Sequence, residues 1–325
     1  MNNHGDGTAP HHGMKSKTIR MILRRKVSAW LDTIKDQDLK NRCRSEAIVT
    51  GGSIASMLLG EDVNDFDIYF RTKETVKAVA DYYVAEFENA RKKQGGVEIQ
   101  TYVEELVDTR GKDRVRIVVK SAGVVKDDES PDYDYFESRA PEEAGDYLSE
   151  VMDNLSEVDG ELSEGVDLKC DEYTPAFLSS NAISLRGKVQ LILRFYGDPD
   201  EIHDSYDFSH CMNYWESNTG KLTLRPDALE ALLSRTLTYK GSQYPLCSII
   251  RSRKFVQRGW RINAGQYVKM AMQLNDLELT NFDVLEEQLT GVDVAYFQQV
   301  IAKLKEKDMQ SVDSAYLIEL IDRMF

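Results

Sequence analysis

The sequence predicts a mixed α/β core followed by a mostly helical region, and three features support this prediction. In the first part of the chain, short apolar runs typical of buried strands alternate with longer segments of helical periodicity. A glycine turn and a short helix separate the first two of these strands, at residues 51–60. From Pro226 onward, helical periodicity dominates the chain. We therefore expect two lobes, the first α/β and the second helical.

The first lobe is expected to begin with a helix over residues 15–40, because an apolar stripe recurs there every three or four positions. The stripe consists of Ile19, Leu23, Val27, Trp30, Leu31 and Ile34. A short buried strand over 45–52 follows and ends in the glycine turn. The short helix over 53–60 is closed by Gly60, and a second strand covers 65–70.

The rest of the first lobe alternates in the same way. A helix is expected over 74–93, followed by two strands over 96–105 and 114–121. Strand patterns return over 176–185 and 188–197. Because strands and helices follow one another along the chain, a core with a mixed sheet is expected.

Residues 126–172 differ from both flanks, because they are acidic and poor in aliphatic side chains. We interpret them as an insertion and as a candidate docking segment for a protein partner. The predicted domains are a disordered tail at 1–14, an α/β domain at 15–215 and a helical domain at 216–325. Pro226 suits the first turn of the first helix in the last domain. The helices expected there cover about 226–236, 244–258, 264–274, 281–290, 293–306 and 311–324.

The composition restricts the class of protein. The 325 residues are 42% hydrophobic with a mean hydropathy of −0.46, and no apolar run approaches a membrane span. The polar N-terminus resembles neither a signal peptide nor an anchor, and the four cysteines form no CxxC pair, so we expect a cytoplasmic protein with reduced thiols.

The net charge of −14 argues against broad, non-specific coating of nucleic acid. The charge is uneven, however, because residues 15–44 are basic and residues 127–172 are strongly acidic. A local basic groove therefore stays compatible with the composition. We interpret the cations of the first helix most simply as a solvated face.

Two aspartates stand on alternate positions of the second predicted strand. In a strand, residues i and i+2 point to the same face, so Asp65 and Asp67 are expected to lie side by side. Two adjacent carboxylates repel one another unless a cation lies between them. A divalent metal with oxygen ligands, Mg²⁺ or Mn²⁺, is the cation that such a pair suits. The alternative is a pair of strand acids that face solvent.

The glycine turn before the short helix suits a phosphate group. Backbone N–H groups at Gly51, Gly52 and Ser53, together with the helix N-terminus, can hold a triphosphate. A third carboxylate would complete a site for two metal ions, and the candidates are Asp207 and Glu98. Each of these two acids could equally face water at a strand edge or turn.

At these residues the chain resembles the DNA polymerase β-like nucleotidyltransferase superfamily, whose signature is a GG or GS turn, a spacer and a DxD strand. The nearest likeness is to CCA-adding enzymes and bacterial poly(A) polymerases, and the chain also resembles viral and phage proteins with this core. The segment from Tyr206 to His210 resembles their RDFTIN-like motif. The helix with Arg251, Arg253 and Lys254 resembles their arginine-rich helix.

The chain also departs from that family. Ser53-Ile54-Ala55 replaces the valine-arginine-aspartate that follows GG in CCA-adding enzymes. The arginine pair that precedes the DF of the RDFTIN-like motif is missing before Asp207. The resemblance implies transfer of a nucleoside monophosphate from an NTP to a hydroxyl, with an RNA 3′ end, such as that of tRNA, as the favoured acceptor. Asp65, Asp67 and Asp207 would hold the metals, and Asp207 would help to deprotonate the acceptor.

The remaining site residues have two interpretations. Arg251, Arg253 and Lys254 form either a solvated helix face or the nucleotide and primer wall of a cleft between the lobes. His210 is more simply a packed histidine than a base. Two other functions stay open, namely the same chemistry on a protein or small molecule, and a non-catalytic binding or assembly protein that keeps the fold. For a viral protein, the expected location is the host cytoplasm.

Overall fold

The computed structural model describes residues 13–93, 99–107, 111–121, 173–178 and 181–279, together with the positions 281, 284–285, 288 and 318. Four expectations fall outside the described residues. They concern the tail up to residue 12, Glu98, the acidic insertion at 126–172, and most of the helices expected after residue 280.

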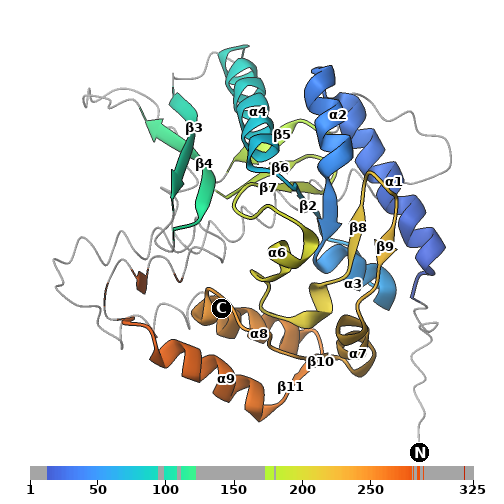
Figure 1. Cartoon of the computed structure of the whole chain (residues 1–325), viewed down its shortest axis with the longest axis vertical. Helices are drawn as coiled ribbons and strands as arrows, with labels where there is room; N and C mark the ends of the chain where they lie inside the picture. The colour runs from blue at the N-terminus through green and yellow to red at the C-terminus, as the bar shows by residue number, and fades with distance from the viewer. Residues whose placement is uncertain are drawn as a thin grey trace, which may run out of the picture.

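A seven-stranded sheet forms the centre of the first lobe, in the order β5-β6-β7-β2-β1-β8-β9 (Figure 1). The strands are β1 (Ile48–Thr50), β2 (Phe66–Tyr69), β5 (Pro175–Leu178), β6 (Ala182–Leu185), β7 (Val189–Ile192), β8 (Tyr214–Glu216) and β9 (Leu222–Thr223). The sheet is mixed, because β2 and β7 are parallel whereas the other neighbours are antiparallel. The predicted fold class is confirmed.

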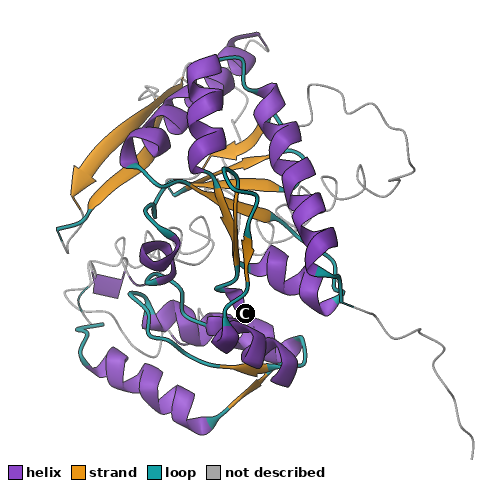
Figure 2. Cartoon of the chain, turned by 45° about the vertical axis from the view of Figure 1, so that its right-hand side comes forward, coloured by secondary structure: helices purple, strands orange, loops and turns teal. Residues whose placement is uncertain are grey.

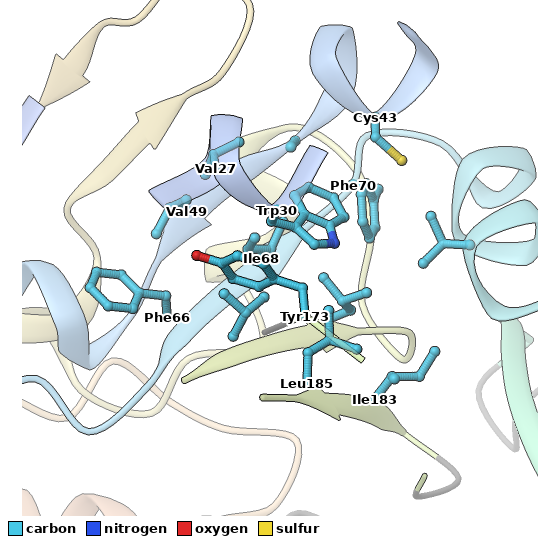
Figure 3. Close-up of a cluster of buried hydrophobic side chains, with 14 of the residues drawn as sticks. Val27, Trp30, Cys43, Val49, Phe66, Ile68, Phe70, Tyr173, Ile183 and Leu185 are labelled. Carbon is cyan, nitrogen blue, oxygen red and sulfur yellow. The ribbon is translucent and has the colours of Figure 1, made fainter. Parts of the chain in front are cut away.

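The two faces of this sheet carry different groups. On one face, Val49, Phe66 and Ile68 belong to the main hydrophobic core, in which Trp30 and Phe70 pack with ring centroids 6.2 Å apart (Figure 3). Because side chains alternate along a strand, Asp67 lies on the opposite face of β2. The apolar side chains of β2 therefore face the core, and the Asp67 side chain lies on the other side of the sheet.

Three long helices cover the core face: α1 (Ser16–Thr33), α2 (Gln37–Glu46) and α4 (Lys73–Lys93) (Figure 2). Trp30 of α1 is fully buried, and its indole N–H donates to the hydroxyl of Tyr83 in α4 at 2.8 Å. The ribbon of β3 (Ile99–Val107) and β4 (Asp113–Ser121) packs on α4 and adds Val115 and Ile117 to the same core.

The single helix expected over 15–40 is wrong, because two helices occupy this region. α1 ends at Thr33, and α2 begins at Gln37. Asp36 interrupts the helix: its carboxylate accepts hydrogen bonds from the backbone N–H groups of Asp38 and Leu39 at 2.9 and 3.0 Å. An aspartate that caps a new helix in this way satisfies N–H groups that would otherwise lack partners.

The second lobe contains α7 (Pro226–Ser234), α8 (Pro245–Gln257) and α9 (Ala264–Asn275), with a short parallel pair of β10 (Thr236–Leu237) and β11 (Arg261–Ile262). Pro226 stands in the first turn of α7, as expected. These elements pack around a second, smaller core that contains Phe208, Tyr239 and Trp260 and also Ala55 of the first lobe.

Short elements between the lobes were not predicted. They are α6 (Pro199–His203), the 3-10 turn η2 (Ser209–Cys211) and the strands β8 and β9. The sheet consequently continues through Thr223, beyond the expected domain boundary at residue 215. In the described part of the chain, no helix combines the length and the apolar character that a membrane crossing requires.

Candidate functional site

The glycine turn brings the backbone against the aspartate strand. Gly51 has φ of 103° and ψ of −153°, a conformation that side-chain-bearing residues rarely adopt. A Cβ at this position would lie 2.8 Å from Oδ2 of Asp67 and 3.5 Å from the hydroxyl of Tyr206. Gly51 therefore allows an approach that any larger residue would obstruct. Its N–H donates to the carbonyl of Cys211 at 3.1 Å, so this N–H already has a partner.

The helix α3 (Gly52–Leu59) begins directly after this turn. Gly52 is exposed, and no neighbouring atom would lie within 4 Å of a Cβ built there. Ser53 is buried, and its Oγ has no hydrogen-bond partner among the described residues. The first N–H groups of a helix lack intrahelical partners. The predicted phosphate site thus retains Gly52, Ser53 and the start of α3 as available donors.

Asp65 and Asp67 interact as the alternation of the strand predicts. Burial raises the pKa of Asp67 well above its ordinary value, and the charge of Asp65 raises it further. The guanidinium of Arg251 acts in the opposite direction and lowers that pKa. At Asp67, burial and the charge of Asp65 together therefore outweigh the effect of Arg251.

Asp207 lies beside the same guanidinium. Its Oδ2 accepts from Nη1 of Arg251 at 2.5 Å, and only 11% of the Asp207 side chain is exposed. The Asp207 charge raises the pKa of Arg251, so this arginine stays protonated. Arg251 comes from α8, in the second lobe, and connects that helix electrostatically to the sheet.

The other two predicted cations lie on the same helix as Arg251. Arg253 and Lys254 are exposed on α8. With 3.6 residues per turn, a position two residues after Arg251 points to nearly the opposite side of the helix. The three cations were expected to act as one wall, and Arg251 is the one that forms an ion pair with Asp207.

Two tyrosines form the wall behind Asp67. The hydroxyl groups of Tyr69 and Tyr206 are 3.1 Å apart, and the rings lie with centroids 6.2 Å apart. Burial is the first cause that raises the pKa of each phenol, and the charge of Asp67 contributes. Both phenols consequently stay neutral and serve as hydrogen-bonding groups. Sequence reasoning missed this pair, because it depends on a contact between positions 137 residues apart.

The two histidines near the site are packed and neutral. Nε2 of His203 lies 2.8 Å from Oγ1 of Thr50, and burial lowers the pKa of this histidine to about 4. His210 packs against Phe255 and Trp260 at centroid distances of 4.6 and 4.4 Å, and burial lowers its pKa to about 4. The interpretation of His210 as a packed histidine agrees with this position.

The sequence profile of the Gabija anti-defense 2 family matches residues 21–235, about two thirds of the chain. The protein belongs to the Gabija anti-defense 2 family.

A curated relative supports this assignment. The protein named Gabija anti-defense 2 from Bacillus phage SPbetaL7 is 24% identical over 128 residues, which are 39% of this chain and 32% of the relative. The chain therefore matches about a third of the length of this relative. The match agrees with the predicted likeness to phage proteins.

Solved structures with a similar fold include CCA-adding enzymes. The Thermotoga maritima CCA-adding enzyme complexed with tRNA is 14% identical, with a TM-score of 0.36, over 87% of this chain and 54% of that one. A tRNA-processing enzyme with CTP is 12% identical, with a TM-score of 0.34, over 81% and 53% of the two chains. The chain spans about half of each enzyme. Identities and TM-scores this low say nothing about a shared activity.

In this member of the Gabija anti-defense 2 family, the donor set fits a metal ion in part. Asp65 and Asp67 offer two carboxylates whose charges interact, and such a pair suits a hard divalent cation. Asp207, the third candidate, is paired with Arg251. Among the described residues, no group of three or more histidine, cysteine or acidic side chains is arranged to hold a metal ion.

Proposed function

We propose that this member of the Gabija anti-defense 2 family is a metal-dependent nucleotidyltransferase that counters Gabija defence in the host cytoplasm. The reaction would move a nucleoside monophosphate from an NTP to a hydroxyl group and release pyrophosphate. One observation carries the proposal: the Asp65 and Asp67 pair meets the glycine turn at the start of α3, with Gly51 against Asp67.

The start of α3 is the proposed triphosphate site. The N–H groups of Gly52 and Ser53 belong to the first turn of the helix, where anions are stabilised. The Ser53 hydroxyl is buried and has no partner among the described residues, so the proposed donors to a phosphate are the backbone N–H groups. Gly52 leaves the approach open, because a Cβ there would have no neighbour within 4 Å.

Asp65 and Asp67 would hold Mg²⁺ or Mn²⁺, with Asp207 as the proposed third carboxylate. When bound, the metal supplies charge stabilisation to the phosphates and activates the attacking hydroxyl. The ion pair with Asp207 keeps Arg251 in position beside the carboxylates. Arg251 is therefore placed to offset negative charge on a bound nucleotide, and Tyr69 and Tyr206 close the wall behind Asp67.

The proposed acceptor is an RNA 3′ end, such as that of tRNA. This choice rests on the resemblance of the sequence motifs to template-independent RNA nucleotidyltransferases. A protein or a small molecule is the alternative acceptor for the same chemistry.

The test is incubation of the protein with each labelled NTP, Mg²⁺ or Mn²⁺, and a mixed pool of small RNAs, followed by gel analysis. We expect a labelled product with the unmodified protein and its loss in Asp65→Asn and Asp67→Asn. Asp62→Asn is the matched control, because it removes an exposed carboxylate from the loop just before the pair. Full transfer by either site variant would remove the proposed metal site.

A second function is favoured by Arg251, which already places a cation beside the carboxylates. In a non-catalytic protein that binds a component of the Gabija system, this arginine would take over the neutralising role of a metal. Calorimetry separates the two functions. Binding of NTP with Mg²⁺ supports the enzyme, whereas absence of any binding supports the non-catalytic protein.

A further inference from the structure

We infer that the outer face of α1 binds the phosphate backbone of a single-stranded nucleic acid. The choice of nucleic acid over an acidic protein rests on the proposed function, whereas the groove itself is independent of catalysis. The groove has a volume of about 420 Å³ and is lined by residues of α1 and by Gly220, in the turn between β8 and β9. Its lining includes Lys17, Arg20, Arg24 and Arg25.

The four cations occupy one stretch of a single helix. With a rise of about 1.5 Å per residue, Lys17 and Arg25 are separated by about 12 Å along the axis. All four side chains belong to exposed residues, and no described acidic side chain forms an ion pair with any of them. A row of this kind matches the regularly spaced phosphate charges of a nucleic-acid strand.

This arrangement is unfavourable for α1 alone. Like charges at i and i+4, such as Arg20 and Arg24, destabilise a helix. Lys17 stands in the first turn of α1, which contains no acidic residue, so it adds positive charge to the positive end of the helix dipole. A bound anion would relieve both effects. A row of mutually repelling cations is also unusual in a chain whose net charge is −14.

The floor and the edge of the groove suit a single strand of nucleic acid. Met21 lies between the cations and is 64% exposed, which offers an apolar surface to a base or a sugar. Gly220 forms the opposite edge, where a Cβ would lie 2.5 Å from Nη2 of Arg24. The glycine therefore lets this guanidinium extend across the turn. Arginine guanidinium groups bind phosphate in a bidentate manner.

The test is a titration of a short fluorescent single-stranded RNA at several salt concentrations. Arg20→Gln, Arg24→Gln and Arg25→Gln are combined in one groove variant, which changes the net charge from −14 to −17. Glutamine keeps a helix propensity close to that of arginine. The matched control combines Lys35→Gln, Arg42→Gln and Arg44→Gln, which remove the same charge from exposed positions outside the groove. Circular dichroism and the melting temperature check that both variants fold.

Each lost phosphate contact makes the negative slope of log affinity against log salt shallower by about 0.7. Because the groove variant loses three cations, its slope should be shallower by about 2. Between about 50 and 200 mM salt, the affinity of the unmodified protein should therefore fall roughly 16-fold more than that of the variant. The control should keep the original slope. Asp65→Asn should also keep it, so a failure of the catalytic proposal leaves this result unchanged.

Three results would overturn the inference. They are absence of RNA binding by the unmodified protein, equal slopes for the unmodified protein and the groove variant, and an equal loss in the charge-matched control. A polyglutamate peptide of matched charge is titrated in parallel. If this peptide binds as tightly as the RNA and loses affinity in the groove variant, the face docks an acidic protein segment and the assignment to nucleic acid is wrong.

Discussion

The side chain of Asp67 brings together the strongest electrostatic features of the candidate site. Burial and the charge of Asp65 both favour its protonated form, and Arg251 opposes them. A carboxyl group whose folded-state pKa exceeds its unfolded value of about 3.9 loses stabilising free energy as the pH rises through that range. At neutral pH without a bound cation, the ionised pair therefore destabilises the folded protein.

Asp67→Asn should consequently raise the melting temperature of the metal-free protein at neutral pH. The gain should shrink below about pH 4, where the unfolded carboxyl group is also protonated. With Mg²⁺ and NTP, the order should reverse, because only the unmodified protein gains stability by binding. Thermal unfolding of the protein, of this variant and of Asp62→Asn measures these differences. A lower melting temperature of the metal-free variant at neutral pH would contradict the prediction.

Gly51 and Gly52 are neighbours with opposite requirements. Gly51→Ala should destabilise the protein by about 1–3 kcal/mol, because it forces a side chain into a glycine-only backbone conformation. The new Cβ would also contact Oδ2 of Asp67, at 2.8 Å. Gly52→Ala is the control: it lies in the first turn of α3 with free space around it, so it should be neutral or slightly stabilising. Denaturant unfolding gives both values, and equal effects at the two positions would contradict this account.

At the scale of elements, sequence patterns predicted those helices and strands whose signal lies in their own residues. The sequence from Ser45 to Phe70 predicted β1, α3 and β2, because the buried strand, the turn, the short apolar helix and the alternating strand each have a local signal. The break between α1 and α2 was missed, because the apolar stripe continues to Ile34, and the capping role of Asp36 depends on backbone geometry.

Elements that depend on distant partners could not be predicted. β8 has three residues, and it is a strand because β1 pairs with it, from Ile48 opposite Glu216 to Thr50 opposite Tyr214. The pairing of Arg251 with Asp207 likewise needs α8 to pack beside the sheet. The candidate metal pair was therefore within reach of sequence reasoning, whereas the cation beside it was not.

For the whole molecule, His203 and His210 make the free energy of unfolding depend on pH. His203 lies behind the sheet against Thr50, and His210 lies within the aromatic cluster of the second lobe. Nδ1 of each ring lacks a hydrogen-bond partner among the described residues. Both rings are held neutral, since burial lowers the pKa of each to about 4.

The free energy of unfolding should therefore fall as the pH decreases from about 6.5 to about 4. In that range the unfolded histidines bind protons and the folded ones do not, which costs up to about 3 kcal/mol for each ring. His210→Phe should reduce this loss, because phenylalanine fits among Phe208, Phe255 and Trp260 and binds no proton. Denaturant unfolding at a series of pH values measures the slope for the protein and the variant. Since His203 is unchanged in the variant, about half of the histidine-dependent slope should remain, and parallel profiles would show that His210 does not carry its share.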